Sequence, residues 1–358
     1  MKLFNIDLHV SVIGDLRSIF VDLGHEVEDW SMSGHAWVFR RKRSNIDVIN
    51  HNNWRLIDKN MSDSFYDRYK DELGKYDAFV VTHTPCFSML YERFNKPIIV
   101  VCSTRYEEPF SSDMIKWKKF NNYLIDGVDK GRIKLVANNK YDKKYTETFL
   151  NRQVELIPSL CEYTRAAYTG VNKKFLYSSK YKTKITLPRD VSLVDKELEL
   201  GTGYSWQDLF SYGGIVHIPY NASTMSIFEQ YTANVPLFFP TIEFLADLRS
   251  KNHDKGVMSE LSWNQVFRLP PGSTVGPMRD DPNNYLNNQV LMKWAELSDF
   301  YDQENMPYIQ YFDSFEHLGC MLRETNLEDI SNKMKEHNVA RKSGVYEKWN
   351  KVLKEIKE

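Results

Sequence analysis

Apolar runs and helical spacings alternate from the start of the chain. Residues 2–8 form a short apolar run that predicts a strand, and apolar positions recur at helical spacing over residues 15–23. Gly24 predicts the end of that helix, because the C-terminal cap of a helix often needs a positive φ. A second strand is expected over residues 25–30. This order of strand, loop, helix and strand predicts the opening of a parallel βαβ unit.

The same alternation continues to about residue 157 and returns, less regularly, in the second half. In the first half, the further predicted strands are residues 76–82, 98–102, 133–137 and 154–157. In the second half, they are residues 174–178, 215–218, 236–239 and 308–312. Helices are predicted over residues 143–150, 206–212, 224–233, 327–336 and 345–357. Gly213 and Gly214 are expected to separate a helix from the strand that follows, and residues 250–288 to form long loops with a short helix.

Length and pattern together predict an α/β chain with two Rossmann-like domains. A chain of 358 residues usually forms about two domains, and both halves follow the order of a doubly wound parallel sheet. We expect an N-terminal domain over residues 1–156 and a second domain over residues 157–335. Residues 336–358 are expected to form a C-terminal helix that packs back on the N-terminal domain.

The charge balance argues against a protein that is held on nucleic acid. The chain has 47 Lys and Arg against 48 Asp and Glu, for a net charge of −1, whereas duplex-binding proteins usually carry a basic footprint. The basic run Arg40–Arg43 is expected to be a solvated turn rather than a nucleic-acid or membrane patch. No stable nucleic-acid binding is therefore expected.

Cysteine usage and hydropathy bear on the compartment. The four cysteines show no CxxC or Cys/His metal spacing, which favours reduced thiols in a cytoplasmic protein. The N-terminal residues have no signal-peptide pattern, and no apolar run approaches the ~20 residues that span a bilayer. Any contact with a membrane is expected to be peripheral.

Four segments carry a resemblance to a known class of enzymes: Leu23–Val27, Leu135–Tyr141, Val154–Ser159 and His217–Pro236. With these segments the chain resembles the GT-B glycosyltransferases, and the last segment is similar to the donor-site motif of family 4-like members. The resemblance implies two Rossmann-like domains facing across a cleft, with the acceptor on the first and the donor on the second. It implies transfer of a sugar from a UDP- or GDP-sugar to a glycan or other hydroxyl acceptor, without a cofactor or metal.

The donor-site segment also suits this role on physical grounds. The predicted strand ends near Pro219, and a helix begins close to Ser223, Thr224 and Ser226. Free N–H groups and the positive end of a helix favour a phosphate there, and hydroxyl groups add donors. Glu229 lies in the first turns, where its carboxylate could accept two hydrogen bonds from the ribose hydroxyls, the role of a Glu at this place in the resembled class. The plainer interpretation is an N-capped helix with a surface Glu.

Other donor-side candidates follow the first strand of the second half. Ser178 ends this strand and Lys180 follows it closely, where ligands of doubly wound sheets bind. Lys180 is the candidate for the diphosphate, with Lys182 and Lys184 as substitutes, although a lone Lys is as often a solvated charge. Tyr204 is a candidate for stacking on the nucleobase, and Trp206 for either stacking or the core.

On the acceptor side, His9, His35 and His83 each follow a predicted strand. A histidine has a pKa near 6.5 and suits proton removal from an acceptor hydroxyl. In inverting members of the resembled class, a His after the first strand can be the base, which points to His9, with Asp15 to orient it and His83 as a similar candidate. A lone loop His is more often a local hydrogen-bond partner, and a three-His metal site is a minor alternative.

Several alternatives remain open at this point. Retaining members of the class often carry a Glu eight residues before the ribose Glu, but Asn221 stands there. This difference weakens a retaining mechanism and leaves room for an inactive nucleotide-binding relative. A sugar-nucleotide epimerase and a phage-type DNA-base glycosyltransferase are the other candidates. A nicotinamide enzyme is disfavoured, because the loop after the first strand has one Gly and no GxGxxG.

Overall fold

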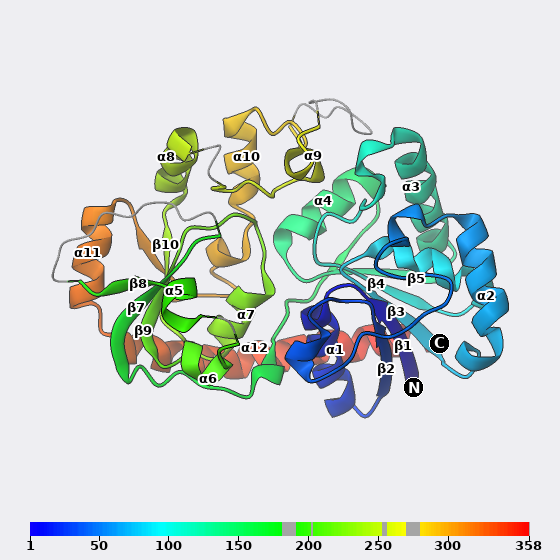
Figure 1. Ribbon diagram of the computed structural model, residues 1–358, viewed down its shortest axis with the longest axis horizontal. Coiled ribbons are helices and arrows are strands. Elements are labelled where there is room, and N and C mark those ends of the chain that lie inside the picture. Colours follow the sequence, from blue (N-terminus) through cyan, green and yellow to red (C-terminus); the bar gives the residue numbers. More distant parts are fainter. Residues whose placement is uncertain (181–190, 202, 253–255, 270–279, 358) are drawn as a thin grey trace. The chain divides into compact units, whose positions relative to one another are not determined.

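The computed structural model describes the chain except for residues 181–190, 202, 253–255, 270–279 and 358. Contacts divide it into two units. The first contains Met1–Ser159 and the chain from residue 344 onward, and the second contains the described residues from 160 to 343. Each unit has its own parallel sheet with helices packed beside it (Figure 1). The predicted α/β chain with two Rossmann-like domains is therefore confirmed.

The sheet of the first unit has six parallel strands in the order β2-β1-β3-β4-β5-β6. The strands are β1 (Lys2–Asp7), β2 (Glu26–Ser31), β3 (Ala78–Thr82), β4 (Ile98–Cys102), β5 (Ile133–Ala137) and β6 (Glu155–Leu156). The chain first adds β2 on one side of β1 and then crosses to add β3 on the other side. The order therefore reverses between β1 and β3, and at such a switch point the loops diverge and leave room for a ligand at the carboxyl ends.

Helices of the first unit connect these strands. They are α1 (Val10–Asp22), η1 (Ala36–Phe39), η2 (Trp54–Leu56), α2 (Lys59–Leu73), η3 (Pro85–Phe94), η4 (Phe110–Ser112), α3 (Met114–Asp129) and α4 (Lys140–Leu150). Asp58, Asp113 and Asn139 begin α2, α3 and α4 by accepting hydrogen bonds from backbone N–H groups of the first turn. The strand pattern did not predict α2 or α3, whose mean hydropathy is low. Strands β3 and β4 are buried at every position, which explains their unbroken apolar runs.

The sheet of the second unit has five parallel strands in the order β11-β10-β9-β7-β8. They are β7 (Asn172–Ser178), β8 (Leu193–Asp195), β9 (Tyr212–His217), β10 (Leu237–Pro240) and β11 (Gln310–Phe312). The chain adds β8 on one side of β7 and β9 on the other, so the switch point of this sheet lies between β7 and β9. The segments that the sequence marks for a nucleotide follow these two strands.

The helices of the second unit are short except for the last. They are η5 (Glu162–Thr164), α5 (Lys196–Leu200), α6 (Trp206–Leu209), α7 (Met225–Thr232), α8 (Ile242–Asn252), α9 (Trp263–Val266), α10 (Asn288–Ala295), η7 (Asp299–Tyr301), α11 (Phe315–Glu324) and α12 (Leu327–Glu355). The two predicted C-terminal helices are one continuous helix, α12, because a single Gly344 costs only about 1 kcal/mol and does not end it. The end of α12 belongs to the first unit, where the Trp349 ring lies 5.0 Å from the Phe20 ring of α1.

The prediction that Gly213 and Gly214 separate a helix from a strand is wrong. The helix α6 ends at Leu209, and both glycines lie inside β9. A β-carbon added at Gly214 would lie 2.8 Å from the carbonyl oxygen of Pro236 and 3.0 Å from the Phe238 ring. Glycine is present there because the neighbouring strand β10 passes too close for any side chain.

Two glycine substitutions are expected to change the free energy of unfolding in opposite directions. Gly214→Ala should destabilise the protein by about 1–3 kcal/mol, because its methyl group would meet backbone that cannot move freely. Gly344→Ala should stabilise it by about 0.5–1 kcal/mol, because the site within α12 is open. Urea unfolding of both variants measures this, and equal effects of the two substitutions would contradict the packing described for β9.

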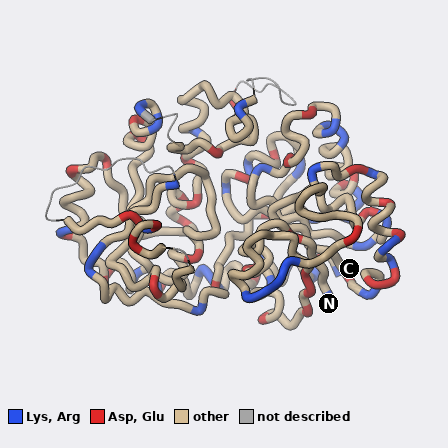
Figure 2. Tube along the Cα trace, viewed as in Figure 1, with Lys and Arg blue, Asp and Glu red and all other residues tan. Residues whose placement is uncertain are grey.

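Charges are distributed evenly over the tube of the chain apart from one basic stretch. Figure 2 shows Lys and Arg interspersed with Asp and Glu, and the four consecutive cations Arg40–Arg43 follow η1. Arg41 pairs with Asp29, so the run is not wholly free to bind phosphates. Among the helices of the described residues, none combines the length and hydropathy needed to cross a membrane.

Candidate active site

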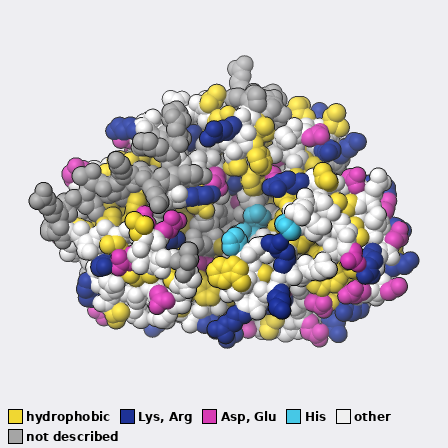
Figure 3. Space-filling view, in the orientation of Figure 1, with side chains coloured by type: hydrophobic (Ala, Val, Ile, Leu, Met, Phe, Trp, Pro, Cys, Tyr) yellow, Lys and Arg dark blue, Asp and Glu magenta, His cyan; other side chains and the backbone are white. Residues whose placement is uncertain are grey.

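At the switch point of the first sheet, two histidines meet. His9 follows β1 and immediately precedes α1, and His83 follows β3. Their rings stack with centroids 4.9 Å apart and planes 12° from parallel. Both side chains are half-buried and His35 is exposed, and Figure 3 shows histidine side chains reaching the surface. The fold thus brings together two histidines that are 74 positions apart in the sequence.

Both stacked histidines are held in the neutral form. Burial lowers the pKa of His83 to about 3, with further lowering by the nearby charges of His9 and Arg105. Burial is also the main cause of the lowered pKa of His9, and the charge of His35 adds to it. A neutral imidazole at pH 7 has a free lone pair and can accept a proton.

The predicted role of Asp15 in orienting His9 stays a prediction. In the described part of the chain, the Nδ1 of His9 is buried and has no hydrogen-bond partner, so Asp15 does not hold this nitrogen. Asp15 lies buried within α1. His35 comes close enough to influence His9 electrostatically, but the described residues hold no group of three or more His, Cys, Asp or Glu side chains able to bind a metal ion.

Charged residues that sequence reasoning missed lie in the loop after β4. Arg105, Glu107 and Glu108 are all buried, although they are charged and lie close together in a loop. Tyr145 of α4 donates a hydrogen bond to Glu107 at 2.7 Å, and Arg55 donates one to Glu108 at 3.2 Å. The sequence feature that could have revealed these charged residues is a run of polar residues directly after a fully buried strand, at the same edge of the sheet as the histidines.

Two buried carboxyl groups at this edge have raised pKa values. Burial raises the pKa of Glu107 to about 8 and that of Asp7, the last residue of β1, to about 7. The hydroxyl group of Ser31 donates a hydrogen bond to Asp7 at 3.1 Å and opposes part of this rise. These groups therefore bind protons more tightly in the folded chain than in the unfolded one.

The raised pKa of Glu107 predicts how stability depends on pH. Between its ordinary pKa of 4.5 and about 8, the folded state binds more protons at Glu107 than the unfolded state. The contribution of this group to the free energy of unfolding is therefore fully present below pH 4.5 and is lost as the pH rises through 8. Glu107→Gln cannot ionise, so its stability relative to the wild type should improve by about 1 kcal/mol or more between pH 5 and pH 9. Unfolding titrations at both pH values test this, and a constant difference would show that Glu107 is ionised in the fold.

In the second unit, α7 begins directly after the carboxyl end of β9. Its N-cap residue Thr224 makes no side-chain capping bond, and the Thr224 and Ser226 hydroxyl groups are 3.1 Å apart. Ser226 is exposed. Ser223 is buried and donates its hydroxyl hydrogen to Asp299. Asn221 accepts a hydrogen bond at 2.8 Å from the N–H of Ala222, so its side chain shapes the turn.

Glu229 is held by two aromatic side chains. The Tyr163 hydroxyl donates to one carboxylate oxygen at 2.6 Å, and Nε1 of Trp206 donates to the other at 3.1 Å. The two rings lie 5.6 Å apart. Burial raises the pKa of Glu229, and the two hydrogen bonds counteract this. Sequence reasoning did not mark Tyr163, which lies 66 positions away, and gave Trp206 a different role.

Lys180 and Tyr204 complete the predicted donor residues. The Lys180 ammonium forms an ion pair with Glu260 and lies 4.4 Å from the centre of the Tyr220 ring, while Ser178 pairs with His217 in the sheet. Tyr204 is exposed, and Lys182 and Lys184 fall outside the described residues. Glu260 also lines a cavity of about 770 Å³ whose other walls include Arg268, Gln265 and Asn288.

Comparisons with known proteins bear on the fold. No protein-family model and no curated protein sequence matches the chain. Solved structures do match. The glycotransferase of kitacinnamycin is 11% identical in sequence to this chain, with a TM-score of 0.48, over 99% of this chain and 98% of that one. SnogD, a glycosyltransferase from Streptomyces nogalater, is 12% identical with a TM-score of 0.46 over 99% of both chains. MnaA from S. aureus, solved with UDP, is 12% identical with a TM-score of 0.39, over 86% of this chain and 92% of that one.

These structures are distant matches, and TM-scores below 0.5 support no conclusion about the family or function of this chain. At 10–12% identity, this likeness assigns no residue a role. The family 4-like motif around Glu229 and the roles of His9, Asp15, His83, Ser178, Lys180, Tyr204, Ser223, Thr224, Ser226 and Glu229 stay predictions, and the function proposed next rests on the chain's own side chains.

Proposed function

We propose that this chain is a glycosyltransferase that moves a sugar from a UDP- or GDP-sugar to a hydroxyl group of a glycan or other acceptor. The donor would bind at the β7–β9 switch point of the second unit. The acceptor would bind at the β1–β3 switch point of the first. The proposal depends chiefly on one observation, which is the arrangement of side chains along α7.

Helix α7 offers groups for a diphosphate and a ribose on one face. Its first turn carries the exposed Ser226 hydroxyl, and the positive amino end of a helix favours phosphate oxygens. Glu229 lies three residues further, and residues at this spacing share a helix face. Phosphate and ribose are joined in a nucleotide at about the distance of one helical turn. The Glu229 carboxylate already accepts one bond on each oxygen and keeps lone pairs for the ribose hydroxyls.

The cavity lined by Glu260 is linked to the candidate donor residues through two contacts of Glu260, although no residue of α7 lines it. Its volume of about 770 Å³ falls within the range of small-molecule sites. The N–H of Glu260 donates a hydrogen bond of 2.9 Å to the carbonyl oxygen of Tyr220, which ties the cavity wall to the loop after β9. The ion pair with Glu260 holds Lys180 beside the same wall of the cavity. A diphosphate that enters the cavity could replace Glu260 as the ion-pair partner of Lys180.

On the acceptor side, His9 supplies the base. As the acceptor oxygen forms a bond to the anomeric carbon, the bond from this carbon to the diphosphate breaks and the hydroxyl proton passes to His9. The nucleoside diphosphate leaves with the bonding electrons, and N–H groups and hydroxyls at α7 stabilise its negative charge. The neutral state of His9 makes this proton transfer possible at pH 7.

A panel of nucleotide sugars tests the proposal. Purified protein would be mixed with UDP-, GDP- and other nucleotide sugars, and both the melting temperature and the release of nucleoside diphosphate would be measured. We expect one UDP- or GDP-sugar to raise the melting temperature and to be hydrolysed slowly without an acceptor. Conversion of the donor into an epimer would instead indicate an epimerase, stabilisation without turnover an inactive relative, and no response to any nucleotide sugar would contradict the proposal.

A further inference from the structure

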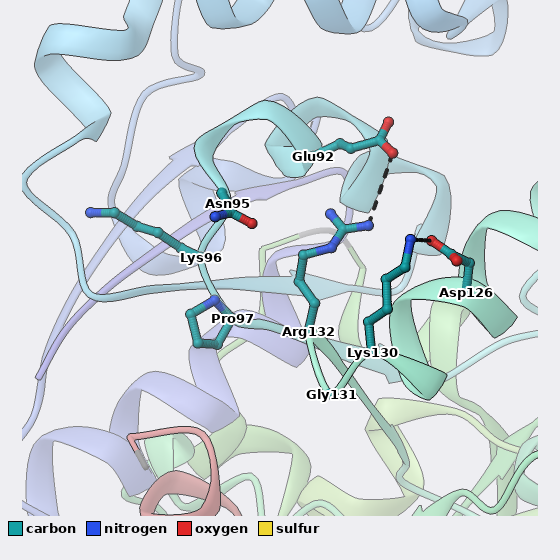
Figure 4. A pocket seen from close by; sticks show the side chains of 8 residues that line it. All are labelled: Glu92, Asn95, Lys96, Pro97, Asp126, Lys130, Gly131 and Arg132. Carbon is teal, nitrogen blue, oxygen red and sulfur yellow. Dashed lines mark hydrogen bonds and ion pairs between the residues drawn. The ribbon is translucent and has the colours of Figure 1, made fainter.

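The first unit has a pocket at the edge of the sheet opposite to its histidines. It has a volume of about 450 Å³ and lies where β4 and β5 begin. Its walls come from the end of η3, the residues before β4, and the end of α3 with the turn into β5 (Figure 4). The pocket is lined by Glu92, Asn95, Lys96, Pro97, Asp126, Lys130, Gly131 and Arg132. Because His9 and His83 follow the carboxyl ends of the strands, this pocket is separate from the candidate acceptor site.

Arg132 is the buried cation of this pocket. Its side chain is 14% exposed, whereas the side chains of Glu92, Asp126 and Lys130 are all more than half exposed. Its Nη2 forms an ion pair with Glu92, drawn as a dashed line in Figure 4, and at 3.9 Å the two groups are beyond hydrogen-bond distance. Among the described residues, Nη1 is buried and has no hydrogen-bond partner. The guanidinium carbon also lies 5.6 Å from the centre of the Tyr123 ring. A guanidinium that has lost most of its water is costly, and an anion bound at its exposed edge would relieve part of this cost.

The other charges leave the pocket with a positive excess. Lys130 pairs with Asp126 at 2.8 Å, and Glu92 is the carboxylate nearest to Arg132. Lys96 donates to the carbonyl oxygens of Gly74 and Tyr76 rather than to a carboxylate, so its charge is not neutralised by them. Three cations therefore face two carboxylates.

We propose that this pocket binds the phosphate group of a small phosphomonoester, with Arg132 as its principal ligand. Guanidinium groups bind phosphate through paired N–H donors, and Nη2 of Arg132 lies beyond hydrogen-bond distance of its nearest carboxylate, Glu92. The volume exceeds that of a phosphate ion and leaves room for a small organic group. Lys96 and Lys130 add positive charge to the lining, although Figure 4 shows Lys96 directed away from Arg132 and Lys130 directed to Asp126. This site stands independently of the proposed transfer reaction.

Thermal unfolding with added anions tests this site. The probes are inorganic phosphate and glycerol 3-phosphate, with sodium chloride at equal ionic strength as the control for salt. We expect a saturable rise in melting temperature with glycerol 3-phosphate that chloride does not reproduce. A rise with inorganic phosphate alone would show a simple anion site and overturn the phosphomonoester part of the proposal, and no saturable rise with either would overturn it entirely.

Variants separate this site from phosphate binding elsewhere. Arg132→Gln should abolish the rise, and Arg152→Gln, which removes another cation of the first unit that pairs with Asp129, should leave it unchanged. Glu92→Gln removes the competing carboxylate and should strengthen binding several-fold, which remains measurable even if Arg132→Gln folds poorly. Glu229→Ala should keep the full rise. Retention of the rise in Arg132→Gln, or weaker binding in Glu92→Gln, would contradict the proposal.

Discussion

Replacement of His9 by alanine is expected to lower kcat for sugar transfer by about 10²- to 10⁴-fold, the usual contribution of a general base. His9 is the N-cap residue of α1, in the turn that follows β1 at the switch point of the first sheet, and burial keeps it neutral. Without it, the acceptor hydroxyl would have to lose its proton to water. Steady-state kinetics with the donor and acceptor identified in the nucleotide-sugar panel would measure the loss.

The matched control is His35→Ala, which removes an exposed histidine near His9. It should change kcat by no more than a few-fold, and donor affinity should be unchanged in both variants. Because the pKa of His9 is lowered from 6.5, the wild-type rate should hold at pH 6.5 and fall only at more acidic pH, as His9 becomes protonated. An equal loss in both variants, or a rate that falls already above pH 6.5, would remove His9 as the base.

Glu229→Ala is expected to weaken nucleotide binding by about 10- to 100-fold. A hydrogen bond to a charged acceptor contributes about 1.5–3 kcal/mol, and each 1.4 kcal/mol is tenfold in affinity. Titration calorimetry with UDP and GDP would measure the change. The substitution also leaves Tyr163 and Trp206 without their shared partner, so the loss must be separated from a change in local structure.

A deoxynucleotide separates these two effects. If Glu229 binds the ribose, the 2′-deoxy nucleotide should bind more weakly than the ribonucleotide to the wild type, but equally to Glu229→Ala. Tyr163→Phe, which removes one hydrogen bond to Glu229 and keeps the carboxylate, should retain the preference for the ribonucleotide. An undiminished preference in Glu229→Ala would show that the carboxylate does not contact the ribose.

The sequence predicted the parts of the fold that depend on local pattern. Parallel strands buried on both faces, such as β3 and β4, appear as unbroken apolar runs and were found close to their true bounds. Helices α2 and α3 were missed, although each begins at an Asp that caps it and each buries two aromatic side chains, Phe65 and Tyr69 in α2 and Trp117 and Phe120 in α3. The prediction for Gly214 was wrong because a glycine is needed there by the close approach of β10, a segment about twenty residues away in the sequence.

The candidate site was predictable only as separate residues. The strand-end rule pointed to His9 and His83, but the ring stacking and the lowered pKa values arise from the pairing of β1 with β3. In the same way, no local signal connects Tyr163 to Glu229. Loops that follow parallel strands converge in space from distant positions, so sequence spacing alone cannot state which of them touch.

The most direct measurement is a crystal structure of the protein with UDP or GDP. We expect phosphate oxygens within hydrogen-bond distance of the first N–H groups of α7 and of the Ser226 hydroxyl, and a hydrogen bond between a ribose hydroxyl and Glu229. A nucleotide bound away from the β7–β9 switch point, or a Glu229 carboxylate that keeps only Tyr163 and Trp206 as partners, would contradict it.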